Sequence, residues 1–130
     1  MDCLEIPQEV NRISGEIVDA AYKVHSQLGP GLLESVYEVC LSHELVARGL
    51  HVQKQVQLPV IYDGITLDAA LRLDMLVDDK VVVELKAVEV LHPVYEAQVL
   101  TYLKLSGKRV GLLINFNVSS IKNGIKRLVL

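Results

Sequence analysis

The hydrophobic period of this chain first changes at Gly49. Before Gly49, apolar side chains recur every three or four positions, as they do along one face of an α-helix. After it, apolar and polar residues alternate, as they do along a β-strand with one buried face. The chain is therefore expected to begin with helices and to continue as a sheet, which indicates an α/β domain.

Three helices are expected, over about residues 7–27, 32–48 and 93–106. Pro7 and Pro93 suit the first turn of a helix, where the missing N–H costs no hydrogen bond. The first helix stops at the run Gly29-Pro30-Gly31, and the second stops at Gly49. Two helices are thus expected before the sheet and one within it.

Four strands are expected, over residues 52–60, 65–77, 81–87 and 108–115, and residues 125–130 suit a short edge strand. Asp63-Gly64 and Asp78-Asp79-Lys80 are short turns, so the first three strands form an antiparallel meander. A strand that follows a helical crossover is usually parallel to a neighbour. We therefore predict a mixed β-sheet with a three-strand meander, flanking helices and a fourth core strand after a helical crossover. Residues 1–130 are expected to form a single domain.

The period of two also predicts which side chains share a face of the sheet. One side of the first strand is expected to hold Val52, Lys54, Val56, Leu58 and Val60. One face of the second strand is expected to hold Leu71, Leu73, Met75 and Val77, and the other Ala70, Arg72, Asp74 and Leu76.

Composition supports a buried core and argues against several classes of protein. The chain is 51% hydrophobic and 22% charged, so it has enough aliphatic material for a core and is not expected to be disordered. No stretch approaches the roughly 20 apolar residues that span a bilayer, and the acidic start lacks the pattern of a signal peptide. We therefore expect a cytoplasmic protein with no membrane partner. Cys3 and Cys40 are too few for a disulfide scaffold, and Cys40 is expected in the core.

The formal net charge of −3 disfavours a protein that coats nucleic acid through a broad basic surface. It does not exclude a nuclease, because a carboxylate-rich metal site lowers the formal charge and the bound cation partly reverses it locally. Charge alone leaves nucleic acid open as a substrate.

Three polar residues of the expected strands, Asp74, Glu84 and Lys86, carry the most informative pattern. The turn at residues 78–80 makes their strands adjacent, so Asp74 can approach Glu84 across the sheet. The period of two puts Glu84 and Lys86 on one face. Two converging carboxylates make a hard-oxygen site suited to Mg²⁺, to which the carbonyl of Leu85 can add a ligand.

A solvated pair of charges at the edge of the sheet gives the same spacing. Against this alternative, Glu84 and Lys86 follow Val81-Val82-Val83, an apolar run typical of an interior strand. Charges in such a place cost desolvation energy unless partners or a metal ion compensate them. Spacing alone leaves both alternatives open.

Three further polar residues fall on expected helices. Gln98 and Tyr102 are four residues apart and share a helix face, where their polar groups suit phosphate, bases or a catalytic lysine. A tyrosine at such a position is also common as a half-buried core residue. Glu34 begins the second helix, where a carboxylate complements the helix dipole, but against the sheet it would become a third metal carboxylate.

In order along the chain, these polar residues resemble the motif series of PD-(D/E)XK nucleases, in particular their RecB-like branch: Asp74, Glu84-x-Lys86 and Gln98-x-x-x-Tyr102. The resemblance implies a restriction-endonuclease-like core, built from a helix, a three-strand meander, a helix and a strand. One departure is Leu73, which stands where the name of the family has a proline. That proline is not a metal ligand, so the implied chemistry is unchanged.

A second resemblance is to the small bacterial and archaeal GxxExxY proteins, which are grouped with the same superfamily. It rests on Gly31-x-x-Glu34-x-x-Tyr37 and on Asn115-Phe116-Asn117 after the last core strand. Together the resemblances cover nearly the whole chain, from about Ile13 to Leu128.

These resemblances imply a metal-dependent nuclease that hydrolyses phosphodiester bonds of nucleic acid, with DNA favoured over RNA. Asp74 and Glu84 would bind Mg²⁺ or Mn²⁺, and Glu34 would be an additional ligand. Lys86 would position the attacking water or help to deprotonate it. Support of the site or contact with the substrate backbone would fall to Gln98 and Tyr102.

Two histidines have competing interpretations. An upstream histidine can join the metal in RecB-like enzymes, so His25 is either a ligand or a residue that binds exposed carbonyls near the end of its helix. His92 precedes Pro93 and is expected to begin the helix or to face the substrate.

Two other functions remain open. One is a catalytically silent nucleic-acid-binding module on the same fold. The other is a homodimeric interaction module, in which the polar residues only organise the core and the 51% hydrophobic content supplies a dimer interface. Metal binding separates the interaction module from the other two, and cleavage separates the nuclease from the binding module.

Overall fold

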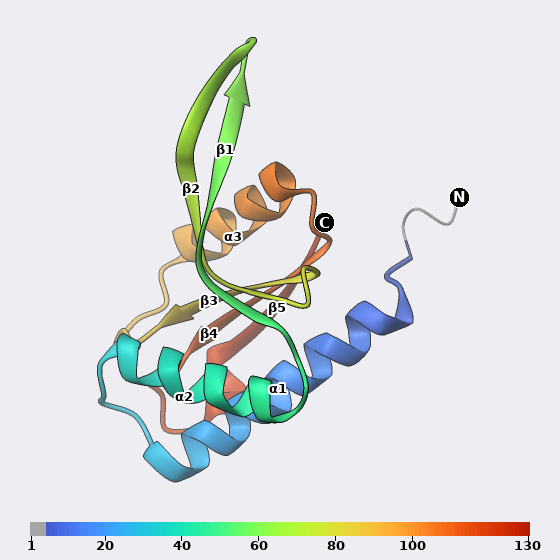
Figure 1. Ribbon diagram of the computed structural model, residues 1–130. Helices are drawn as coiled ribbons and strands as arrows, with labels where there is room; N and C mark the ends of the chain where they lie inside the picture. The colour runs from blue at the N-terminus through green and yellow to red at the C-terminus, as the bar shows by residue number, and fades with distance from the viewer. Residues whose placement is uncertain (1–4) are drawn as a thin grey trace.

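The chain forms one five-stranded sheet whose strands lie side by side in sequence order, with helices on both faces (Figure 1). The computed structural model describes residues 5–130, so the expectation for Cys3 lies outside the described residues. The elements are α1 (Gln8–Leu28), α2 (Glu34–Ala47), β1 (Val52–Tyr62), β2 (Ile65–Val77), β3 (Val81–Lys86), α3 (Pro93–Ser106), β4 (Val110–Asn115), the 3₁₀ helix η2 (Ile121–Gly124) and β5 (Ile125–Val129).

The mixed sheet and its order are confirmed. β1, β2 and β3 pair antiparallel as a meander, α3 carries the chain across the sheet, and β4 then pairs parallel to β3. β5 adds an antiparallel edge beside β4, where a short edge strand was expected. Among residues 5–130, no helix combines the length and the apolar character needed to cross a bilayer.

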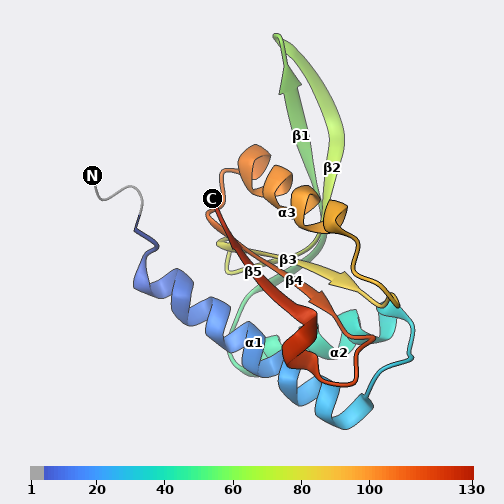
Figure 2. The ribbon, with the colours of Figure 1, turned by 180° about the vertical axis from the view of Figure 1, so that it is seen from behind.

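Two apolar clusters hold the helices to the sheet. The first packs α1 and α2 on one face, where Ile13, Ile17, Leu41 and Leu45 have no exposed surface. The second packs α3 on the other face through Val99 and Leu103 (Figures 1 and 2). Cys40 is only half-buried at the margin of the first cluster, so the expectation of a core cysteine holds in part.

The predicted faces of β1 and β2 are wrong, because the hairpin changes faces midway along its length. Met75 and Val77 pack against α1 and α2, whereas Leu71 and Leu73 pack in the cluster under α3. In the same way, Val52 belongs to the first cluster, and Val56, Leu58 and Val60 belong to the second.

The physical cause of the change of face is the backbone of Gln55. Its φ of 53° lies in the left-handed region, which interrupts the alternation of a strand. Gln55 lies between the Lys54–Met75 and Val56–Leu73 pairs, and therefore beside Asp74. Its side-chain amide donates to Glu38 of α2 over 2.8 Å. The hairpin beyond this point leaves the sheet and runs past α3 (Figure 1).

The connection between α1 and α2 is fixed by Tyr37. Its hydroxyl donates to the Gly29 carbonyl over 2.6 Å and accepts from the Leu32 N–H over 3.1 Å. Its ring stacks on Phe116, with 4.5 Å between ring centroids and 6° between planes. The Gly31 N–H donates to the side-chain oxygen of Asn117 over 3.1 Å. These contacts hold the start of α2 against the end of β4.

Asn115 fixes the segment that follows β3. Its buried side chain donates to the Val88 carbonyl over 3.0 Å and accepts from the Val88 N–H over 3.1 Å. The Phe116 N–H donates to the Lys86 carbonyl over 3.0 Å. The segment containing Asn115, Phe116 and Asn117 therefore ties together the ends of β3, β4 and α1.

We predict that Tyr37→Phe lowers the free energy of unfolding by about 1–3 kcal/mol, because it leaves the Gly29 carbonyl and the Leu32 N–H without a shared partner. Urea unfolding followed by circular dichroism measures the change. Tyr22→Phe is the matched control, since Tyr22 is 43% exposed on α1. Equal stability of the two variants would contradict a structural role for the Tyr37 hydroxyl.

Candidate metal and catalytic site

The site lies where β2 and β3 separate. Backbone pairing between these strands runs from Val77–Val81 to Met75–Val83 and then stops. Beyond it, the Asp74 N–H donates to Glu84 Oε1 and the Leu85 N–H donates to Asp74 Oδ2, each over 2.9 Å. Each carboxylate thus accepts a backbone N–H of the neighbouring strand, in place of a backbone carbonyl. We call this region, where the two acids meet, the fork.

Residue alternation in β3 points both of its charged side chains toward α3. Val83 and Leu85 pack in the first cluster, and Val82 packs in the second. Glu84 and Lys86 alternate with the first pair, so they lie on the α3 face, as predicted. Glu84 is 4% exposed and Lys86 is half-buried.

Burial, and after it the negative charge of Asp74, raises the pKa of Glu84 from 4.5 to about 8. The Asp74 N–H and the charge of Lys86 oppose this rise without cancelling it. In the metal-free protein the pair therefore retains a proton near neutral pH. A cation between the two acids would stabilise their charged forms, so the donor set fits a divalent metal.

The carbonyl of Leu85 points toward the gap between β3 and β2, where their backbone pairing has stopped. The N–H and C=O of one strand residue point to the same side, and the Leu85 N–H reaches Asp74. The next carbonyl, that of Lys86, points the other way and accepts from Phe116. Strand geometry thus directs the Leu85 carbonyl to the side on which Asp74 lies, and its role as an additional oxygen ligand stays a prediction.

Glu34 is near the pair but does not complete a three-acid cluster. It is the first residue of α2 and is exposed. Burial raises the pKa of Glu34, Asp74 raises it further, and Lys86 lowers it, so all three lie within electrostatic range of one another. Across the described residues, however, no three His, Cys, Asp or Glu side chains gather closely enough to hold a metal ion. The role of Glu34 as a ligand stays a prediction.

Tyr102 faces the acids from α3, whereas Gln98 makes no comparable contact. Burial, then Glu84 and Asp74, raises the pKa of the half-buried Tyr102 hydroxyl. Gln98 lies one turn earlier on α3 and is exposed. The roles predicted for both residues stay predictions.

Tyr95 is a neighbour of Lys86 that sequence reasoning missed. The Lys86 Nζ lies 4.4 Å from the centroid of the Tyr95 ring, a cation–π contact. The only signal in the sequence was that Tyr95 precedes Gln98 by three residues, which puts them on adjacent positions of one helix. His92 lies edge-on to Tyr95 at 6.4 Å, and its Nδ1 accepts from the Val94 N–H, so it caps α3.

His25 has a structural contact that does not involve the acids. Its ring is buried, and its Nε2–H donates to the Val118 carbonyl over 2.7 Å. Of the two interpretations of His25, the structure supports the one in which the ring binds a backbone carbonyl. That carbonyl belongs to the loop after β4 rather than to the end of its own helix.

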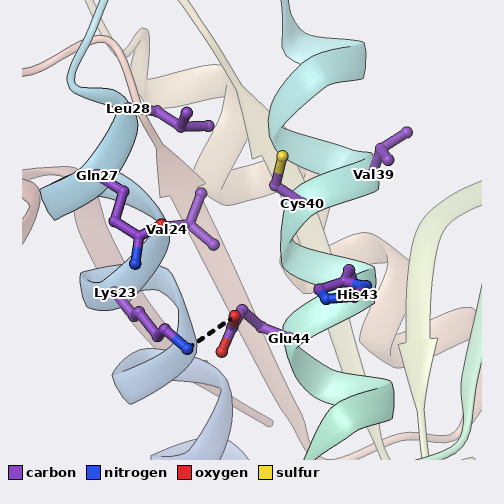
Figure 3. Close-up of a pocket in the computed structure, with 8 residues that line it drawn as sticks. All are labelled: Lys23, Val24, Gln27, Leu28, Val39, Cys40, His43 and Glu44. Carbon is purple, nitrogen blue, oxygen red and sulfur yellow. Dashed lines mark ion pairs between the residues drawn. The ribbon is translucent and has the colours of Figure 1, made fainter.

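A cavity of about 280 Å³ lies apart from this site, between α1 and α2 (Figure 3). Cys40 and His43 line it from α2, and a 3.1 Å ion pair between Lys23 and Glu44 spans it. None of its lining residues belongs to the fork between β2 and β3.

Comparison with known proteins agrees with this arrangement. The family described as the PD-(D/E)XK nuclease superfamily matches residues 11–128, which is almost the whole chain. No match to a curated protein or to a solved structure was found.

We predict that the metal-free protein loses stability as pH rises from about 4.5 to about 8, because the folded state keeps the Glu84 proton after the unfolded state has lost it. The slope from this group approaches ~1.4 kcal/mol per pH unit. Glu84→Gln removes that component, and Mn²⁺ at pH 8 restores stability to the wild type but not to the variant. Thermal unfolding in chelator measures both effects, with the exposed Glu9→Gln as control. A pH dependence shared by wild type and Glu84→Gln would contradict the raised pKa.

Proposed function

The chain belongs to the PD-(D/E)XK nuclease superfamily, and we propose that it is a Mg²⁺- or Mn²⁺-dependent nuclease that hydrolyses phosphodiester bonds of nucleic acid. The observation that carries the proposal is the fork between β2 and β3, where the half-buried Asp74 and the buried Glu84 share one site. Holding two acids together there costs desolvation and repulsion, which a strand pair would avoid with apolar residues.

In the proposed mechanism, Asp74 and Glu84 would hold the metal through their carboxylates, and the Leu85 carbonyl would be a further oxygen ligand. When bound, the cation would polarise the phosphate and lower the pKa of a coordinated water. Lys86 presents a compact positive charge on the same face as Glu84 and orients the water or takes part in its deprotonation. The ring of Tyr95 restricts where that ammonium can lie.

The remaining polar residues have supporting roles in this proposal. Glu34 would be an additional ligand, since it is exposed at the start of α2 and lies within electrostatic range of Asp74 and Lys86. Tyr102 would support the site beside the acids or contact the substrate backbone. Gln98 contacts the substrate from the exposed face of α3.

Within the superfamily, we propose membership of the RecB-like branch and of the GxxExxY group. The contacts of two segments support the second assignment: Tyr37 stacks on Phe116, and the Gly31 N–H donates to Asn117. Residues characteristic of that group therefore meet in space, at the end of α2 that carries Glu34.

We also propose a domain organisation, a cellular location and binding partners for the protein. Residues 1–130 act as a single nuclease domain in the cytoplasm. We propose DNA as the substrate, and RNA is the alternative to be tested in the same assay. A second copy of the chain is the other proposed partner.

We predict that Asp74→Asn and Lys86→Ala each lower metal-dependent cleavage by a factor of about 100 or more, by different routes. Asp74→Asn weakens Mn²⁺ binding, because it removes a charged ligand but keeps an oxygen that can accept from the Leu85 N–H. Lys86→Ala preserves Mn²⁺ affinity, because lysine supplies no ligand. Calorimetric Mn²⁺ titration beside cleavage of single-stranded, duplex and branched DNA and RNA measures both properties.

Glu9→Ala and Lys122→Ala are the matched controls, since both residues are exposed and lie outside the fork. Equal cleavage by wild type, Asp74→Asn and Lys86→Ala would place the activity elsewhere or in a contaminant. Metal binding without cleavage of any substrate would instead favour the catalytically silent binding module.

We predict that Tyr95→Leu lowers cleavage by a factor of about 2 to 30, which corresponds to loss of a cation–π contact of ~0.5–2 kcal/mol. Tyr95→Phe keeps the ring and retains wild-type activity. The two rates are compared over a pH series with folding checked by circular dichroism. A Phe variant as slow as the Leu variant would assign the effect to the hydroxyl and contradict positioning by the ring.

A further inference from the structure

The end of the β1–β2 hairpin projects from the molecule as an arm, which we define as residues 56–71 (Figures 1 and 2). Its two strands pair only with each other, because the pairing between β2 and β3 stops at Met75–Val83. Both outer edges of the arm therefore lack a neighbouring strand within the described chain. An isolated two-stranded hairpin is at best marginally stable in water.

The tip of the arm is unusually apolar for a projecting segment. Ile61 is 72% exposed, Tyr62 71% and Ile65 58%. Tyr62 pairs with Ile65, and Val60 pairs with Leu67, so these four side chains share one face. That face continues the buried cluster under α3, to which Val60 belongs. Exposed apolar strands of this kind mark interaction surfaces.

The charges of the arm select the kind of partner. Its charged residues are Asp63 and Asp68, and the nearest cation, Arg72, pairs with Gln57 at the base of the arm, away from the apolar tip. Binding to nucleic acid depends on cations that neutralise phosphates, so the arm is unsuited to the proposed substrate. An apolar surface with acidic residues instead fits an apolar protein surface that carries a cation.

Such a surface lies at the base of the same arm. A groove of about 370 Å³ separates the arm from the C-terminal end of α3, and it is lined by Leu58, Pro59, Val60, Ile61, Lys104, Leu105 and Ser106. Leu105 is 44% exposed, and Lys104 is exposed beside it. Within residues 5–130, neither Lys104 nor the two aspartates of the arm form an ion pair.

We propose that the arm is a homodimer interface, in which the tip of each copy packs into the groove at the base of the arm of the other. A two-fold arrangement uses the same tip and groove twice, so one self-complementary surface closes the assembly. The apolar tip covers Leu105, and Asp63 or Asp68 of one protomer approaches Lys104 of its partner. The inference rests on the second copy of the chain that we proposed as a partner, and it identifies the surface that this copy would bind. The oligomeric state tests it independently of cleavage.

Sedimentation velocity over a wide concentration range tests the proposal with the full chain. The wild type is expected to form dimers, and the double variant Tyr62→Ser/Ile65→Ser is expected to raise the dimer dissociation constant at least tenfold, since it removes two large apolar contacts. Val39→Ser, which changes a 60% exposed residue of α2, is the matched control and keeps the wild-type constant. Circular dichroism confirms that each variant is folded.

Charge reversal separates this pairing from general stickiness of the arm. Lys104→Glu alone and Asp63→Lys/Asp68→Lys alone are expected to weaken the dimer, and the combination of all three is expected to restore it. A wild type that stays monomeric overturns the proposal, as does a dimer that the arm variants leave unchanged.

Discussion

The exchange of hydrogen bonds between Asp74 and Glu84 is the constraint on which the rest of the site depends. Each carboxylate accepts a backbone N–H from the strand of the other, so the acids end the pairing of β2 with β3 and take its place. These amides offset part of the cost of burying two like charges, and a proton on Glu84 offsets more in the metal-free state. In the metal-free fork the charge of the two acids is only partly compensated, an arrangement that favours binding of a cation.

Helices on both faces of the sheet place side chains near this fork. α3 supplies Tyr102 beside the acids and Tyr95 beside Lys86. α2 begins at the same end of the sheet because Tyr37 holds its first turn against Phe116. The residues that resemble the GxxExxY group thus have mainly a structural role. Their contacts determine how close Glu34 lies to the charges of Asp74 and Lys86.

Regular segments could be predicted from the sequence, and irregular ones could not. β3 alternates without interruption, so the common face of Glu84 and Lys86 followed from their spacing. The faces of β2 did not follow, because the left-handed Gln55 belongs to the neighbouring strand and leaves no mark on the period of β2 itself. Tyr95 was missed for a related reason: its contact with Lys86 joins a helix to a strand across the fold. The helix bounds were close, and α2 begins two residues later than expected, at Glu34, because Tyr37 holds the preceding loop.

The contacts that close the fold also determine when it can close during synthesis. His25 binds Val118 and Gly31 binds Asn117, across separations of 93 and 86 residues, and β3 needs β4 as its parallel neighbour. The acids and Lys86 leave the ribosome well before Asn115 and Phe116, the residues that fix their surroundings. A chain that ends before Asn115 therefore carries Asp74, Glu84 and Lys86 while lacking the contacts that fix their surroundings.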